Sequence, residues 1–224
     1  MGVIIALTII ILWISNLLIS LFYSKVSLFS PLFYLYVLLQ AYLFTGLFIT
    51  GHDAMHGTIS DKKYLNNIFG YISVFLFAGM WYPRLVRYHQ QHHLYPGTDM
   101  DPDYSSRTQN FWIWWFRFIA RYVTIIQLII MAVIYNILRI WFSDASIIFF
   151  WVIPAFLATL QLFYFGTFIP HRRPHTEDMK PYNARTLRKN HLWAMLSCYF
   201  FGYHHEHHSS PETPWWKLYR MKTS

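Results

Sequence analysis

Four long apolar segments limit the folds open to this chain. Each has about the 20 mostly apolar residues that an α-helix needs to cross the roughly 30 Å hydrocarbon layer of a bilayer. They cover residues 3–22, 32–50, 122–142 and 147–169. Only 12% of the 224 residues are charged, and the mean hydropathy is positive, which is unusual for a soluble domain. We therefore expect one all-α integral membrane domain over residues 1–224, with about four transmembrane helices.

A fifth apolar segment, residues 68–82, is too short for a full crossing. It contains Gly70 and Gly79 and stops at Pro83, so we predict a re-entrant or interfacial helix packed against the bundle. Of the 18 Lys and Arg residues, only Lys25 and Arg139 then fall away from the face that carries the histidine groups described next. By the positive-inside rule that face is cytoplasmic. Orientation and anionic headgroups account for the net charge of +8, so no nucleic-acid partner is expected.

Eight histidines occur in three patterned groups. Residues three and four apart share a helix face, so each group can aim its rings at one point. A lone histidine is usually a satisfied polar residue, and we interpret His175, His191 and His205 in that way. Eight patterned histidines at membrane depth would be costly without a shared partner. The predicted metal ligands are His52 and His56, then His89, His92 and His93, then His204, His207 and His208.

The chemistry of these groups favours two metal ions. The single cysteine, Cys198, excludes a thiolate cluster, so imidazole supplies most of the ligands. A catalytic zinc uses three protein ligands, and one zinc cannot use eight imidazoles, whereas two metals can. Imidazole suits iron, copper, zinc and nickel, which leaves the metal open at this point. A membrane zinc hydrolase is an alternative, because H-x3-H on a helix is a zinc pattern, although Asp53 stands where such enzymes carry Glu.

Acidic residues near the histidines are candidates for supporting roles. Asp53 and Glu206 lie inside two of the groups, and either carboxylate can accept the second N–H of a ligating ring. Asp99 and Asp101 belong to an acidic stretch, residues 99–103, that lacks the turn glycine and closing glutamate of a calcium loop. We expect these acids either to hold the histidines at residues 89–93 in place or to form a solvated loop.

The order of these features resembles the membrane fatty acid desaturase and hydroxylase superfamily, whose members hold two irons with such histidine boxes. Four motifs further resemble the bacterial carotenoid ketolases of the CrtW type: H-D-A-M-H-G from His52, P-G-T-D from Pro96, F-G-T-x-x-P-H-R from Phe165 and F-G-Y-H-H-E-H-H from Phe201. The resemblance covers about residues 46 to 211. It implies two Fe²⁺ ions, O2 as co-substrate, and His171 as an additional ligand.

The function implied by this resemblance is carotenoid 4-ketolase activity in the bacterial cytoplasmic membrane. Two hydroxylations at C4 of a β-ionone ring, followed by loss of water, would give a ketone. No flavin, haem or nicotinamide fingerprint is present, so a separate donor, such as ferredoxin, would supply electrons. We expect it to dock on the basic cytoplasmic face, where Arg188 and Lys189 lie. The alternatives are a carotenoid β-ring hydroxylase and a fatty-acid desaturase or alkane hydroxylase.

The aromatic run at residues 111–116 has two interpretations. With Arg117 and Arg121 close by, it is typical of an interfacial belt. Some of its rings could instead line a slot for a long polyene.

Overall fold

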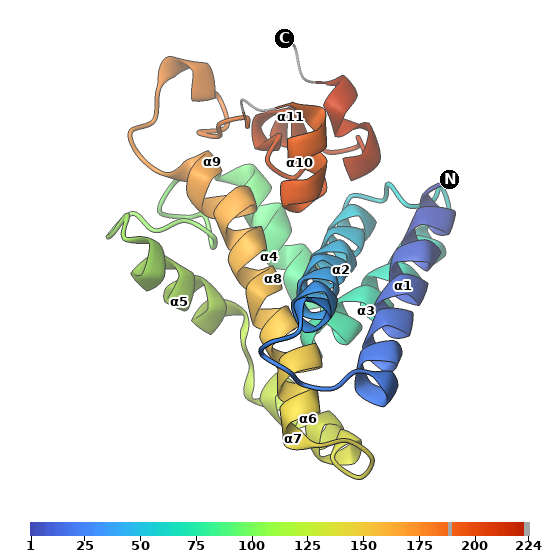
Figure 1. The fold of residues 1–224 in the computed structure, drawn as a ribbon. Coiled ribbons are helices and arrows are strands. Elements are labelled where there is room, and N and C mark those ends of the chain that lie inside the picture. The colour runs from blue at the N-terminus through green and yellow to red at the C-terminus, as the bar shows by residue number, and fades with distance from the viewer. Residues whose placement is uncertain (188–189, 222–224) are drawn as a thin grey trace.

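The computed structural model describes residues 1–187 and 190–221, and that part of the chain is helical apart from its loops, with one isolated β-bridge between Thr186 and Tyr203 (Figure 1). Arg188 and Lys189 lie outside the described residues. The helices before the last long span are α1 (Gly2–Tyr23), α2 (Pro31–Met55), α3 (Lys63–Ala78), α4 (Tyr82–Leu94), α5 (Phe111–Tyr122) and α6 (Ile125–Leu138). A continuous helical run, Asp144–His171, then comprises α7 (Asp144–Ile147), η1 (Ile148–Val152), α8 (Ile153–Phe163), η2 (Tyr164–Phe168) and α9 (Ile169–His171). The remaining elements are η3 (Glu177–Met179), α10 (His191–Cys198), α11 (His204–Ser209) and η4 (Trp215–Arg220).

Three helices are long and apolar enough to cross a membrane alone. They are α1 with 22 residues, α2 with 25, and the run Asp144–His171 with 28. These confirm the predicted segments 3–22, 32–50 and 147–169. The outer faces of these helices carry exposed Ile, Leu and Phe side chains, such as Ile4, Ile11 and Phe156. Such a surface suits lipid rather than water.

The predicted span over residues 122–142 does not form one long helix, although α5 and α6 together are long and apolar enough for a broken span. The chain bends by 88° between α5 and α6. Val123 and Thr124 are extended, and the Thr124 side chain caps α6 by accepting a hydrogen bond from the Gln127 backbone N–H. The 14 residues of α6 extend only about 21 Å, so α6 cannot cross the hydrocarbon layer alone.

A second bend separates α3 from α4, and it lies where the sequence predicted an interruption. Gly79 has a φ of +63°, a conformation that glycine adopts without strain, and Pro83 stands in the first turn of α4. The two helices therefore meet at 98°. As a result, α4 carries its histidines toward the end of α2.

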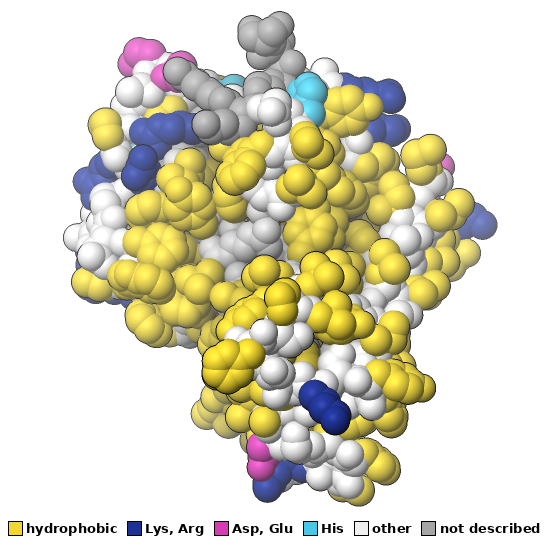
Figure 2. Space-filling model, in the orientation of Figure 1, with side chains coloured by type: hydrophobic (Ala, Val, Ile, Leu, Met, Phe, Trp, Pro, Cys, Tyr) yellow, Lys and Arg dark blue, Asp and Glu magenta, His cyan; other side chains and the backbone are white. Residues whose placement is uncertain are grey.

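The C-terminal elements form a cap on one end of the bundle. Figure 1 shows α10, α11 and the N-terminus at this end, and the α6–α7 connection at the other. Hydrogen bonds tie α10 to the spans: Tyr42 donates to the Met195 carbonyl oxygen at 2.8 Å, and Gln161 donates to the Ser197 carbonyl oxygen at 2.5 Å. Figure 2 shows most of the visible Lys and Arg side chains around the cap and hydrophobic side chains along the flanks.

Candidate metal centre

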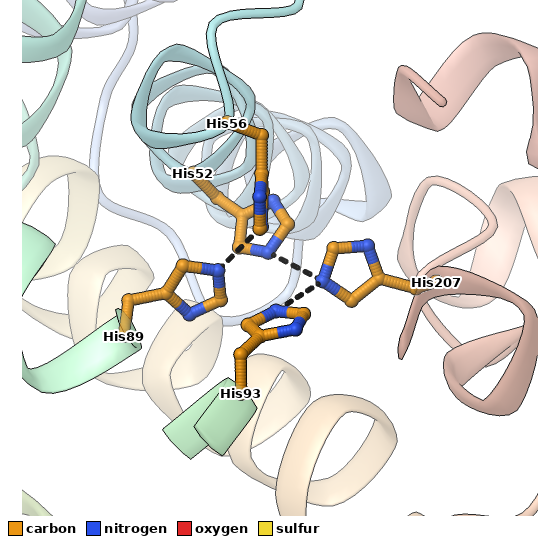
Figure 3. Close-up of side chains that lie close together, drawn as sticks. All are labelled: His52, His56, His89, His93 and His207. Atoms are coloured by element: carbon orange, nitrogen blue, oxygen red, sulfur yellow. Dashed lines mark hydrogen bonds between the residues drawn. The ribbon is translucent and has the colours of Figure 1, made fainter. Parts of the chain in front are cut away.

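The structure brings nine histidines from four helical segments into two groups under the cap. In each group, one ring nitrogen from every histidine lies within 4.8 Å of the others. The first group, drawn in Figure 3, contains His52, His56, His89, His93 and His207. The second contains His92, His171, His204 and His208. These are the nine histidines proposed from the sequence, and His175, His191 and His205 belong to neither group among the described residues.

The two H-x2-H-H boxes are divided between the groups, whereas the sequence led us to expect each box to aim at one point. On α4, His89 and His93 join the first group and His92 joins the second. On α11 the division is reversed, because His204 and His208 join the second group and His207 joins the first. Helix geometry explains both cases. Residues four apart differ by about 40° around the axis, whereas adjacent residues differ by about 100° and point at different targets.

The spacing of the nitrogen atoms suits metal coordination. Nε2 of His207 lies 3.1 Å from Nε2 of His52 and 3.0 Å from Nε2 of His93. Nε2 of His208 lies 3.1 Å from Nε2 of both His92 and His204. Two nitrogens about 2.1 Å from one metal ion are about 3.0 Å apart at 90° and about 3.4 Å apart at the tetrahedral angle. Nε2 of His56 and Nε2 of His89 lie closer, at 2.6 Å, and the rings of each group thus converge on one point.

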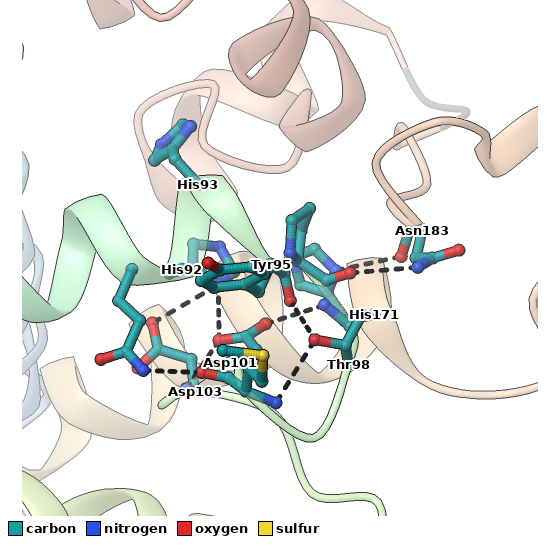
Figure 4. A network of polar contacts seen from close by, with 12 residues as sticks. His92, His93, Tyr95, Thr98, Asp101, Asp103, His171 and Asn183 are labelled. Atoms are coloured by element: carbon teal, nitrogen blue, oxygen red, sulfur yellow. Dashed lines mark hydrogen bonds and ion pairs between the residues drawn. The ribbon is translucent and has the colours of Figure 1, made fainter.

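His171 gives the clearest test of whether the second group fits a metal ion. Its Nδ1 donates a hydrogen bond to the Asn183 carbonyl oxygen at 3.0 Å, so Nε2 carries the lone pair (Figure 4). Within the described chain this buried Nε2 has no hydrogen-bond partner. A buried acceptor without a donor is costly unless something else satisfies it. It faces the other rings of the second group, where a metal ion would satisfy it.

Asp101 holds the other side of the His92 ring. Nδ1 of His92 donates to Oδ1 of Asp101 at 2.9 Å, which turns Nε2 toward the second group. Burial pushes the pKa of Asp101 upward, but the contact with His92 and the Gly97 N–H outweigh burial, so the pKa lies below its usual value. Asp101 is therefore an ionised acceptor for the His92 ring. Asp99 lies in an exposed turn that lines a polar cavity of about 750 Å³ rather than beside a ring.

Asp103 belongs to the acidic stretch at residues 99–103, but it was not among the site residues named from the sequence. Its carboxylate lies 3.9 Å from Nδ1 of His92 and accepts a hydrogen bond from the Tyr122 hydroxyl. Burial raises its pKa to about 6. The sequence signal for a role of Asp103 is its position in the acidic stretch, two residues after Asp101. Both residues lie in the same turn, where the Asp103 N–H donates to Oδ1 of Asp101.

The two acids inside the histidine boxes have different environments. Oδ1 of Asp53 lies 3.4 Å from Nδ1 of His52, and Oδ2 accepts the Trp215 backbone N–H at 3.0 Å. Asp53 thus links a ring of the first group to η4. The Glu206 carboxylate accepts a hydrogen bond from the Thr186 hydroxyl, so it braces α11 against the segment before α10 rather than a histidine ring.

Burial favours the neutral form of His207 and His208, whereas at His92 the Asp101 carboxylate outweighs burial and raises the pKa to about 9. His207 and His208 are almost completely buried. Burial, reinforced by the neighbouring histidines, holds the pKa of both rings well below the usual imidazole value. Metal coordination needs the neutral ring, so the surroundings keep these ligands in the required form.

A small inner cavity of about 50 Å³ lies beside the histidines. Members of both groups line it, together with side chains from the spans. The lining includes His52, His89, His92, His204, Phe48, Leu85, Asp103, Phe118, Tyr122, Leu162, Thr167 and Phe201. The cavity thus adjoins both groups at once.

Fold and site together define a class: an all-helical membrane protein that presents two adjacent clusters of buried and half-buried histidines to an inner cavity. The fatty acid desaturase family profile matches residues 29–140 and 117–223. The chain belongs to this family.

Its relatives are more specific. The chain is 36% identical over 184 residues to a β-carotene ketolase from Paracoccus sp. (strain PC1), covering 81% of this chain and 75% of the relative. It is 38% identical over 182 residues to a zeaxanthin 4-ketolase from Chlamydomonas reinhardtii, covering 79% of this chain and 41% of the relative. A ferredoxin-dependent sn-1 acyl-lipid omega-3 desaturase from Synechocystis is 33% identical over 108 residues, or 44% of this chain and 27% of the relative. No solved structure gives a significant match.

Proposed function

We propose that this protein is a carotenoid 4-ketolase that oxidises C4 of a β-ionone ring to a ketone. The observation that carries the proposal is the convergence of the ketolase-like motifs on one site. Histidines from the H-D-A-M-H-G, F-G-T-x-x-P-H-R and F-G-Y-H-H-E-H-H motifs meet there, and Asp101 beside the P-G-T-D motif holds His92. The similarity to ketolases over four fifths of the chain supports the same substrate class.

We assign one iron ion to each histidine group. The donors fit iron because imidazole is one of its usual ligands and Nε2 of His171 carries a buried lone pair. Five histidines in the first group also exceed what a tetrahedral zinc accepts. When bound, the irons supply the activation of O2, which side chains alone cannot perform.

The protein's own residues position the reactants and keep the site dry. Asp101 and Asp53 orient the rings of His92 and His52. Phe201 is buried against both histidine groups and excludes water from the inner cavity. The ring of the substrate enters this cavity with C4 toward the histidines.

The overall reaction consumes two O2 molecules. Each hydroxylation replaces one C4–H bond by C4–OH, takes up two electrons and two protons, and releases water. The second hydroxylation at the same carbon gives a gem-diol, which loses water to form the ketone. The electrons come from an external donor, for which we propose ferredoxin. The histidine end of the molecule faces the cytoplasm, where this donor is available, and the basic rim suits an acidic partner.

Expression in a bacterium that makes β-carotene tests the proposal. The expected products carry a ketone at C4, which lengthens the conjugated system and changes the colour. A His207→Ala variant serves as the inactive control. A C3 alcohol without a ketone would identify a β-ring hydroxylase, and altered lipid unsaturation with unchanged carotenoids would identify a desaturase. One zinc and no iron in the purified protein would favour a hydrolase.

A further inference from the structure

An apolar groove of about 490 Å³ lies between α3, α5, α6 and α8, on the side of the bundle below the histidine centre. Its volume is in the usual range of small-molecule sites. Leu128 and Phe156 line it and are 57% and 54% exposed, so it opens on the flank that we assign to lipid. Its aromatic lining residues are Phe48, Phe77, Phe118, Tyr122, Tyr135, Trp151 and Phe156.

The groove and the inner cavity share four lining residues, which we call the neck: Phe48, Phe118, Tyr122 and Leu162. Helical spacing explains why the neck adjoins the histidines. Phe48 lies four residues before His52 on α2, so both side chains project from the same face. Leu162 precedes Gly166, another residue of the inner cavity, by the same interval. The groove therefore leads to the centre rather than past it.

The neck is narrow, and one of its members is held in place. The Tyr122 hydroxyl donates a hydrogen bond to Asp103, and the Phe118 and Tyr122 rings lie 4.9 Å apart. A cavity of about 150 Å³ accommodates a benzene molecule. The inner cavity has only about 50 Å³, so a substrate ring enters it when the neck side chains move aside.

We propose that the groove binds the polyene of the carotenoid and that the neck admits one terminal ring to the histidine centre. This proposal rests on the proposed function. It commits to a carotenoid because the groove is continuous with the centre, opens on the apolar flank and is walled by aromatic rings. Such rings suit a flat conjugated chain through dispersion and stacking. A fatty acyl chain is the competing occupant.

Two kinds of substitution separate the groove from the neck. Ala155→Trp and Ala132→Trp fill opposite walls of the groove, on α8 and α6. We expect each to lower ketone formation from β-carotene, and the β-carotene retained on the purified protein, by about tenfold or more. Leu162→Phe narrows the neck alone, so ketone formation falls while β-carotene is retained. Ile148→Trp, on the exposed face of the same helical run, is the matched control and should match the parent in both measurements.

The measurements are chromatography of the products and the carotenoid absorbance of detergent-purified protein. Metal content and a single monodisperse peak establish that each variant is folded. If both groove variants form ketone and retain β-carotene as the parent does, the proposed role of the groove is refuted. If Leu162→Phe forms ketone as the parent does, the proposed role of the neck is refuted. If the parent makes no ketone but retains β-carotene that Ala155→Trp cannot retain, the proposed function fails and the groove stands. Oxidation of acyl chains that Ala155→Trp abolishes would overturn the carotenoid as occupant.

Discussion

Replacing Gly166 by alanine should press directly on the metal centre. A Cβ at this position would lie 2.3 Å from Cε1 and 2.6 Å from Cδ1 of Phe201, whereas ordinary contacts begin near 3.4 Å. The Phe201 ring must therefore move by about 1 Å. Its centroid lies 4.9 Å from that of His52 and 5.2 Å from that of His204, so the ring is confined by both histidine groups.

The expected cost follows from overpacking a buried site. Inserting one methyl group into a close-packed interior costs about 1–3 kcal/mol. For a chain of this length, each kcal/mol lowers Tm by about 2–4 °C. Because Phe201 contacts members of both groups, we also expect the bound metal to fall at both, which a purely local destabilisation would not cause.

Thermal unfolding of the detergent-purified protein, followed by tryptophan fluorescence, measures the first effect, and elemental analysis measures the second. Gly2→Ala is the matched control, because its added Cβ would lie 2.4 Å from the Ile59 carbonyl oxygen rather than against Phe201, so it should lower Tm without loss of metal. Adding Phe201→Leu to Gly166→Ala removes the clash and should restore part of both quantities. Parental Tm and metal content in Gly166→Ala alone would refute the reasoning.

Three further predictions concern the metal ligands. His171→Ala should remove the metal of the second group and keep that of the first, so elemental analysis should fall from about two ions per chain to about one; loss of neither ion would contradict the role of His171. Asp101→Asn keeps the shape of the side chain but weakens its hydrogen bond to His92, so we expect the metal affinity to fall by about 10–100-fold. Competition with a chelator measures this affinity, and Asp99→Asn should leave the affinity unchanged. Stripping the parent protein with a chelator should lower its Tm, because metal bound only by the folded state stabilises that state; an unchanged Tm would show that the histidine groups do not depend on metal.

The spans show how much of the fold can be predicted from patterns in the sequence. The helices α1, α2 and Asp144–His171 follow from apolar runs long enough to cross a bilayer, because a helix satisfies its own backbone hydrogen bonds in lipid. The bend at residues 122–124 did not follow, because it lies at the very start of the predicted segment and hydropathy does not report a change in chain direction. The N-cap at Thr124 was the local signal, and a threonine in an apolar run is a weak one.

The site shows a similar division. Spacing and family resemblance selected nine histidines, and all nine meet. Spacing alone did not separate His92 from His89 and His93. Helix geometry gives the direction of a side chain only relative to the axis of its own helix, and the histidines that His92 joins lie on α9 and α11. Asp103 was missed for the same reason: its role depends on Tyr122, 19 residues away.

The reciprocal use of the two boxes makes the histidine groups interdependent. The helix α4 gives two histidines to the first group and one to the second. The helix α11 gives one histidine to the first group and two to the second. The end of α2 serves only the first group, and α9 serves only the second. Thus neither group is complete until α11 docks between them, and α11 belongs to the cap rather than to the spans. The hydrogen bond from Trp215 to Asp53 fastens the chain that follows α11 to the end of α2, close to His52. Docking of the cap, closure of the inner cavity and assembly of both groups are therefore one event, and metal binding must stabilise the packing of the cap on the spans.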